Sequence, residues 1–209
     1  MSQRTWFITG VSSGFGRQIT EQLLNRGDRV IGTVRDTGKV ADLLAHHPEA
    51  FFAEVLDVTD TAAIRDAVDR SFTRLGRIDV FISNAGYGLF GAAEELTDKQ
   101  VEHMVATNLV GSIQLIRSAL PHLRAQGGGR IIQISSYGGQ VAFPGNSMYH
   151  ATKWGIDTYK VATNVPTLTQ RETWEALDAK QALHRIMVFD ANGTGKVTVE
   201  ENIPIPTQQ

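Results

Sequence analysis

Residues 9–16 read Thr-Gly-Val-Ser-Ser-Gly-Phe-Gly and directly follow a short apolar run at residues 6–8. The next stretch, residues 15–26, has apolar residues at helical spacing and ends at Gly27. Glycine permits a tight turn between a strand and a helix, and it lets backbone N–H groups approach a phosphate. The sequence therefore predicts a strand, a phosphate-binding turn, and a helix whose N-terminus favours an anion.

The same alternation of apolar strands and amphipathic helices continues along the chain. We expect further strands near residues 30–34, 51–56, 78–82 and 130–134. Helices are expected at 40–45, 60–75 and 97–126, the last broken near Asn108 and again near Pro121. Such alternation indicates a parallel sheet covered on both faces, and right-handed crossovers then give a doubly wound α/β fold.

Composition narrows the class of protein further. A chain of 209 residues with 42% hydrophobic and 20% charged residues suits a single globular domain. The net charge of −2 argues against a nucleic-acid surface, and the chain has no apolar run long enough to span a bilayer. No cysteine is present, which fits a reducing compartment. We expect a cytoplasmic protein with neither a nucleic-acid partner nor a membrane partner.

Three more motifs follow the 9–16 turn in a fixed order. They are Asn84-Ala85-Gly86, then Asn108, then Ser136 with Tyr149 and Lys153. The ordered set resembles the short-chain dehydrogenase/reductase family over roughly residues 4–156. The resemblance implies a Rossmann fold and an enzyme that transfers a hydride between a nicotinamide dinucleotide and a secondary alcohol or carbonyl. Small molecules of that class are the partners we expect.

The last motif carries the proton-transfer chemistry. A tyrosine has an ordinary pKa near ~10, and a nearby ammonium group lowers it. Lys153 follows Tyr149 by four residues, so the two share one face of a helix, and Tyr149 is the expected general acid/base. Ser136, 13 residues before Tyr149, is expected to orient the substrate oxygen, with Ser135 as the alternative. The resemblance gives Asn108 a role in the proton relay, and a plain capping asparagine is the alternative.

The expected cofactor-binding residues lie at the ends of four strands. The resemblance assigns the turn (Gly10, Ser12, Ser13, Gly14, Phe15 and Gly16), the pair Asp57-Val58, the motif Asn84-Ala85-Gly86, and Tyr149 with Lys153. Asp57 is alternatively a cap for the following helix. Val34 stands where NAD-dependent relatives have an acid, and Arg35 follows it. A guanidinium there attracts a 2′-phosphate, so we expect NADP(H), with NAD as the alternative.

The chain departs from the family after residue 156. We expect a single domain over 1–209, with a cofactor-binding and catalytic core at 1–156 and an atypical segment at 157–209. A sixth strand is expected at 161–166, which shortens the helix that carries Lys153 and makes a homo-oligomer doubtful. A helix is expected from 169 to 188, opened by Thr169 and Glu172.

Two alternatives concern the end of the chain and the activity. Residues 190–201 partly match a calcium-binding loop, but we favour a final strand at 196–199 and predict no metal. Because the late segment is altered, a nucleotide-binding protein with impaired or no catalysis is the alternative to an enzyme. His46, His47 and His150 show no ligand spacing and are expected to be ordinary surface or packing residues.

Overall fold

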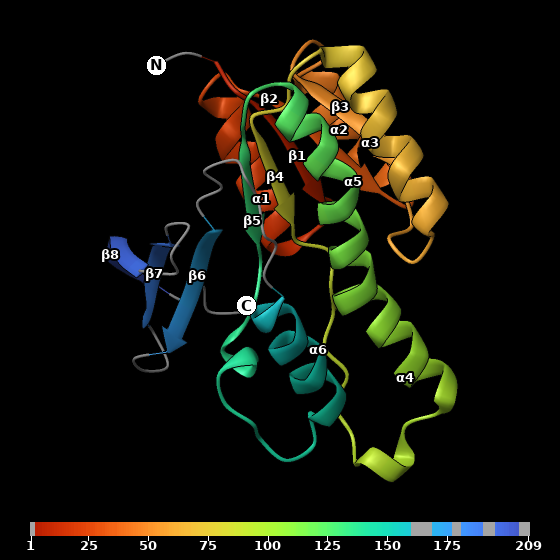
Figure 1. Ribbon diagram of the computed structural model, residues 1–209, viewed down its shortest axis with the longest axis vertical. Coiled ribbons are helices and arrows are strands. Elements are labelled where there is room, and N and C mark those ends of the chain that lie inside the picture. The colour runs from red at the N-terminus through yellow and green to blue at the C-terminus, as the bar shows by residue number, and fades with distance from the viewer. Residues whose placement is uncertain (1–2, 160–168, 177–180, 190–194, 205–209) are drawn as a thin grey trace.

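The computed structural model describes residues 3–159 together with the backbone of three strands at 169–176, 181–189 and 195–204 (Figure 1). Within these residues the strands form one eight-stranded sheet in the order β3-β2-β1-β4-β5-β6-β7-β8. Their bounds are β1 Thr5–Thr9, β2 Arg29–Val34, β3 Phe51–Val55, β4 Val80–Ser83, β5 Arg130–Gln133, β6 Thr169–Ala176, β7 Gln181–Phe189 and β8 Gly195–Pro204. The order confirms the predicted doubly wound α/β fold, since β4 lies beside β1 rather than β3.

Helices connect the parallel strands and cover the sheet. The α-helices are α1 Gly14–Asn25, α2 Ala41–His46, α3 Thr61–Leu75, α4 Asp98–Val105, α5 Ser112–Ala125 and α6 Ser147–Thr158. Short 3₁₀ turns lie at η1 Thr37–Val40, η2 Ala93–Glu95 and η4 Tyr137–Gly139, and a π-helical segment, η3 Ala106–Gly111, joins α4 to α5. Figure 1 shows α3 and α5 side by side along the sheet, and α4 and α6 beyond its lower end.

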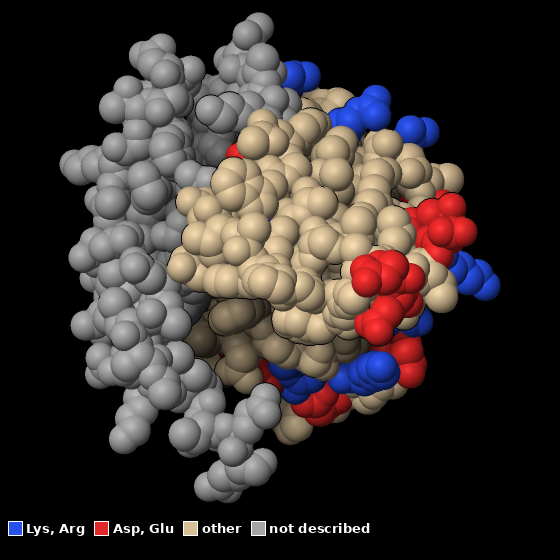
Figure 2. All heavy atoms as spheres, turned by 90° about the horizontal axis from the view of Figure 1, so that it is seen from below, with Lys and Arg blue, Asp and Glu red and all other residues tan. Residues whose placement is uncertain are grey.

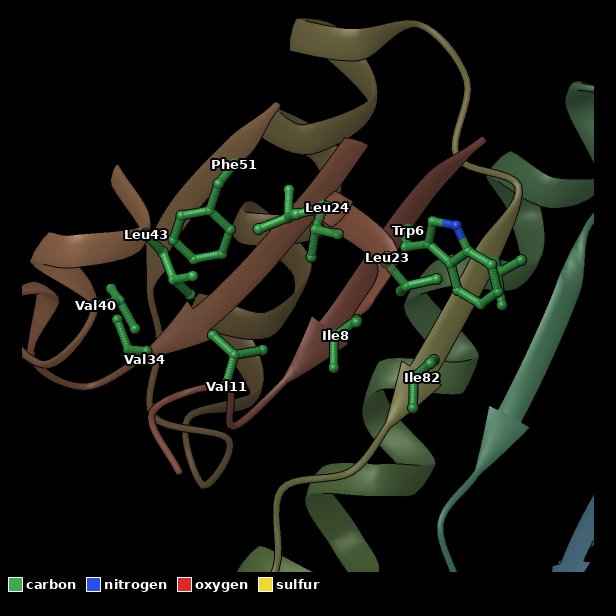
Figure 3. Close-up of a cluster of buried hydrophobic side chains, with 12 residues drawn as sticks. Trp6, Ile8, Val11, Leu23, Leu24, Val34, Val40, Leu43, Phe51 and Ile82 are labelled. Carbon is green, nitrogen blue, oxygen red and sulfur yellow. The ribbon is translucent and has the colours of Figure 1, made fainter. Parts of the chain in front are cut away.

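Side chains from successive residues of β1 enter two separate cores. Trp6 and Ile8 pack with Leu23 and Leu24 of α1 on one face, as Figure 3 shows. Phe7 points to the other face, where it packs with Ile64 of α3 and stacks on Phe81 with ring centroids 5.0 Å apart. This alternation follows from the period of two in a strand, and it explains why β1 is buried throughout.

Local signals at the helix ends agree with the sequence in most places. Thr97 and Gln100 form the predicted capping box at the start of α4. The predicted break near Asn108 is present as the π-helical segment, but the predicted break at Pro121 is wrong, because α5 runs through it to Ala125. Pro121 lies on the exposed side of α5, whose other side packs Leu120 and Leu123 into the protein. Burial of that apolar side outweighs one lost backbone hydrogen bond.

The segment after α6 differs from the sequence prediction. The helix expected at 169–188 is wrong: those residues contribute β6, which pairs in parallel with β5, and β7, which pairs with β6 in antiparallel fashion. A strand is defined by its pairing partner, and the helical spacing of a few apolar residues does not reveal that partner. The final strand expected at 196–199 is confirmed within β8. The sixth strand expected at 161–166 and the first half of the calcium-like loop lie outside the described residues.

None of the helices among the described residues combines the length and apolar character needed to cross a membrane.

Candidate functional site

The turn between β1 and α1 depends on glycine for its backbone conformation and, at Gly16, for space. Gly10 and Gly14 have φ of 73° and 57°, a region that favours glycine. A Cβ on Gly16 would stand 2.2 Å from the carbonyl oxygen of Gly10, so a larger residue does not fit there. The N-cap residue Ser13 makes no side-chain hydrogen bond to the first turn of α1. This end of the helix therefore suits an anion such as a pyrophosphate.

Asn84 ties the turn after β4 to the turn after β1. Its backbone N–H donates to Thr9 Oγ1 at 2.9 Å, and its side-chain amide donates to the carbonyl oxygens of Thr9 at 2.8 Å and Gly10 at 3.2 Å. The N–H of Ala85 also donates to Thr9 Oγ1, at 2.9 Å. The first two predicted motifs therefore meet at the end of the sheet where α1 begins. The Asn84 side chain holds the two turns together through its hydrogen bonds to backbone.

Lys153 and Tyr149 lie on the same face of α6, as their spacing predicts. The ammonium nitrogen of Lys153 donates to the carbonyl oxygen of Ile134 at 3.0 Å and lies 5.7 Å from the centre of the Tyr149 ring. Lys153 is only 6% exposed. Burial lowers the pKa of Lys153 to about 8, while the charge of Asp157 opposes that shift. The lysine is therefore held beside the phenol in a poorly solvated position.

Ser136 comes close to Tyr149 through the short turn η4. Its hydroxyl accepts a hydrogen bond from the Gly138 N–H at 3.1 Å. Gly138 lies against the tyrosine, since a Cβ built on it would stand 3.0 Å from Tyr149 Cε1. The neighbouring Ser135 lies against Gly139, where a Cβ would stand 3.0 Å from Ser135 Oγ, and among the described residues that buried hydroxyl has no hydrogen-bond partner. The structure thus brings Ser136 to the tyrosine, while its catalytic role stays a prediction.

Asn108 lies in the π-helical segment and connects two other parts of the site. Its amide nitrogen donates to the Tyr87 carbonyl oxygen at 2.8 Å and to Thr152 Oγ1 at 3.2 Å, and its amide oxygen accepts from the Tyr87 N–H at 3.0 Å. Asn108 is 1% exposed. Asn108 therefore joins the loop after β4 to α6, and its partner in α6, Thr152, directly precedes Lys153. These contacts go beyond a helix cap, and the predicted part of Asn108 in a proton relay stays a prediction.

Arg35 and Asp57 lie at the ends of β2 and β3, and both are exposed. Hydrogen bonds from Thr59 lower the pKa of Asp57, and the charges of Arg35 and His103 lower it further, against the effect of partial burial. Asp57 does not cap α3, because Asp60 does so by accepting from the N–H groups of Ala62 and Ala63. The alternative of Asp57 as a helix cap is therefore wrong.

For His150 the sequence predicted no more than a surface or packing role. It is 5% exposed, and both ring nitrogens are hydrogen-bonded to backbone: Nδ1 to the Gly138 carbonyl oxygen at 2.8 Å, and Nε2 to the Phe143 N–H at 2.9 Å. His150 is therefore a buried packing residue, which is one of the two expected alternatives, and the surface alternative does not hold. Its position next to Tyr149 was the available signal, but a histidine in a helix does not reveal which backbone groups face it.

Comparison with known proteins agrees with this geometry. Residues 4–167 match the family described as short chain dehydrogenase. The chain is 40% identical over 154 residues to "Oxidoreductase BOA17" of Botryotinia fuckeliana, covering 73% of this chain and 56% of that protein. It is 36% identical over 166 residues to the "3-ketodihydrosphingosine reductase" of Bacteroides thetaiotaomicron, covering 78% of this chain and 58% of that protein.

Solved structures give the same result. A short-chain dehydrogenase from Streptomyces avermitilis is 42% identical with a TM-score of 0.72, and the match covers 75% of this chain and 57% of that one. ElxO with NADP bound is 28% identical with a TM-score of 0.70, and the match covers 74% and 64% of the two chains. The chain thus spans less than two thirds of the length of these relatives. The ordered motifs, the strand order and these likenesses together show that the chain belongs to the short-chain dehydrogenase family.

Proposed function

We propose that the protein is an NADP(H)-dependent oxidoreductase that interconverts a carbonyl compound and a secondary alcohol. The observation that carries the proposal is the buried Lys153 ammonium group beside Tyr149, on a helix that also contacts Ser136 through Gly138. Membership of an oxidoreductase family and NADP-bound structural neighbours support it.

The residues of the first turn fit a dinucleotide. Gly10, Gly14 and Gly16 keep side chains away from the turn, and the start of α1 would hold the pyrophosphate, with Ser12, Ser13 and Phe15 beside it. Asp57 and Val58 would lie on the adenine side. The loop Asn84-Ala85-Gly86 would lie against the nicotinamide-ribose half, because Asn84 and Ala85 are bonded to the turn itself.

The bound nicotinamide would supply or accept the hydride, and this chain's own residues would handle the proton. In the reducing direction the Tyr149 hydroxyl would donate a proton to the substrate oxygen, and in the oxidising direction its phenolate would accept one. The Lys153 ammonium would favour the phenolate form. The Ser136 hydroxyl would hydrogen-bond the substrate oxygen, and Asn108 would support the proton relay behind Lys153.

Exposed aromatic side chains near Tyr149 favour an apolar substrate. Phe90, Tyr137 and Phe143 are 78%, 47% and 49% exposed. The rings of Tyr137 and Phe143 lie 5.6 Å apart, and Phe90 and Tyr149 both lie against Gly88. In Figure 2, seen from the side where α4 and α6 lie, most of the described surface carries no charged residue. A carbonyl compound with an apolar body would contact these exposed aromatic rings favourably.

The decisive test is NADPH oxidation over a panel of apolar and polar carbonyl compounds, with the variant Tyr149→Phe as the matched comparison. We expect turnover for the wild type. We expect the variant to lose at least about 10²-fold in kcat, because the phenylalanine keeps the ring but offers no proton. NADPH binding by the variant, followed by cofactor fluorescence, is expected to change much less than kcat, because Tyr149 is one of many expected cofactor-binding residues. Equal turnover by the two proteins would overturn the role of Tyr149.

The choice of NADP(H) depends on Arg35. We expect Arg35→Ala to weaken NADPH binding by about ten-fold or more while NADH binding changes little, because only the 2′-phosphate meets the guanidinium. The matched control is Asp36→Ala, the neighbouring exposed charge that accepts a hydrogen bond from Gly38 N–H. A loss of the same size for both cofactors would assign Arg35 a structural role.

A second candidate is a protein that binds the dinucleotide without appreciable turnover. The observation that favours it is the early end of α6 at Thr158, five residues after Lys153, shortly before the family match ends at residue 167. The same assay separates the two candidates: NADPH binding with no oxidation across the whole panel would support the binding protein.

A further inference from the structure

We propose that His150 is a positioning residue that holds the segment 136–143 in its reactive place against α6. The inference rests on the proposed function, since the segment begins with Ser136 and packs against Tyr149. The buried imidazole of His150 makes two hydrogen bonds to the backbone of that segment, one at Gly138 and one at Phe143. These bonds tie the segment to α6, the helix that carries Tyr149 and Lys153.

The partners of His150 determine its protonation state. The Gly138 carbonyl oxygen can only accept, so Nδ1 must carry a hydrogen and donate to it at 2.8 Å. The Phe143 N–H can only donate, so Nε2 must offer its lone pair and accept at 2.9 Å. The structure therefore assigns a neutral imidazole protonated on Nδ1. A second proton on Nε2 would face the Phe143 N–H and break that bond.

The bond from His150 to Gly138 connects the imidazole to the proposed catalytic residues. Gly138 accepts from His150 through its carbonyl oxygen and donates through its own N–H to Ser136 Oγ at 3.1 Å. Gly138 also lies against Tyr149, whose Cε1 would stand 3.0 Å from a Cβ at that position. One residue thus links the serine hydroxyl, the tyrosine ring and the imidazole, so a shift of Gly138 changes the distance between the serine and the tyrosine.

The second bond holds the far end of the segment. Phe143 is bonded through its N–H to His150, and the two rings lie 5.4 Å apart. Phe143 also contacts Tyr137, with ring centroids 5.6 Å apart. The same imidazole therefore places Phe143 directly and Tyr137 through Phe143. Because His150 is 5% exposed, removing its side chain leaves both backbone groups without their protein partner in a poorly solvated place.

The protonation state is tested directly by nitrogen NMR of the imidazole rings. The chain contains six histidines, so the spectrum of His150→Asn assigns the signals of residue 150 by difference. We expect a neutral ring whose hydrogen is on Nδ1, the less common form of free histidine in water. A neutral ring protonated on Nε2, or a ring charged at neutral pH, would overturn the proposed hydrogen bonds whether or not the protein is an enzyme.

The positioning role is tested by kinetics of three variants. Asparagine keeps an N–H donor at the place of Nδ1, glutamine keeps an acceptor at the place of Nε2, and alanine keeps neither. We expect His150→Ala to lower kcat about 10- to 100-fold, because the serine and the tyrosine lose their mutual placement. NADPH affinity should stay within about two-fold. We expect His150→Asn to recover more of kcat than His150→Gln, because only asparagine restores the bond to Gly138.

Two results would contradict the role. Equal losses in all three variants would show that the imidazole acts by its shape alone. A loss confined to NADPH affinity would show that it supports the cofactor rather than the segment. If the wild type shows no turnover on any substrate, the proposed function fails, and hydrogen exchange of residues 137–143 then tests the bonds. Faster exchange in His150→Ala than in His150→Asn supports them, and equal exchange overturns them.

Discussion

Lys153 shows how one buried charge links stability to pH. Burial lowers its pKa to about 8, and the ammonium keeps one strong protein partner, the Ile134 carbonyl oxygen. Below pH 8 both the folded and the unfolded chain carry the proton, so the cost of burying the charge is present in full. Between about 8 and the ordinary value of 10.5, the unfolded chain binds more protons than the folded one. Rising pH in that window therefore stabilises the fold.

This prediction is checked by comparing the wild type with Lys153→Met in the absence of cofactor. From pH 7 to 10.5 we expect the wild type to gain about 3 kcal/mol of unfolding free energy relative to the variant, at 1.36 kcal/mol for each unit of pKa. Urea denaturation at several pH values measures the difference, and the effects of titrating groups far from residue 153 cancel between the two proteins. A difference that does not change with pH would contradict a lowered pKa in the folded state.

At the scale of elements, two carboxylates near the start of α3 have different roles. Asp60 caps the helix, whereas Asp57 is a candidate cofactor-binding residue. Asp60 accepts from the N–H groups of Ala62 at 2.9 Å and Ala63 at 3.0 Å. We expect Asp60→Ala to lower the free energy of unfolding by about 1 kcal/mol. We expect Asp60→Asn to lose much less stability, because asparagine keeps the capping oxygen. Urea titration of the three proteins measures this, and equal losses in both variants would argue against a capping role.

The π-helical segment is another element whose meaning depends on its contacts. Residues 106–111 depart from the regular α-helical pattern, and this places the Asn108 side chain against Tyr87 and Thr152. A Cβ on Gly111 would stand 2.5 Å from the Val58 carbonyl oxygen, so the segment also packs closely against the loop after β3. The irregular turn therefore joins the loops after β3 and β4 to α6, which is a reason for its presence at the candidate site.

At the scale of the whole molecule, the parallel strands β1, β2 and β4 and the added strands β6 to β8 differ in the contacts that stabilise them. The strands β1, β2 and β4 lie between two buried cores, whereas β6 joins β5 through two register pairs, Ile132 with Gln170 and Gln133 with Arg171. The strands β6, β7 and β8 pair extensively with one another. We therefore expect β6–β8 to open as a unit at lower free energy than the β1–β4 core.

Native-state hydrogen exchange followed by mass spectrometry checks this expectation. Amides of β1, β2 and β4 should exchange at the rate set by global unfolding, and those of β6 to β8 should exchange together and earlier. The strand β5 serves as the internal reference, because it pairs with β4 on one side and β6 on the other. One common rate for all strands would show that the antiparallel strands unfold with the core.

The sequence by itself determined the first five strands, the helices between them, and which motifs end those strands. These signals are local: a period of two or 3.6 in apolar residues, a glycine after a helix, and a capping pair such as Thr97 and Gln100. Since parallel strands end at the same edge of a sheet, the order of the motifs also predicted that they would meet. The assignment of a single domain and of each site residue to its role remains a prediction.

Only the tertiary structure decided which groups face one another. It placed Asn108 between Tyr87 and Thr152, and it buried His150 between Gly138 and Phe143. It also made strands of 169–176 and 181–189, where the spacing of apolar residues favoured a helix. The physical reason is common to these cases. A side chain's partner and a strand's neighbour come from parts of the chain far away in sequence, and short-range patterns carry no information about them.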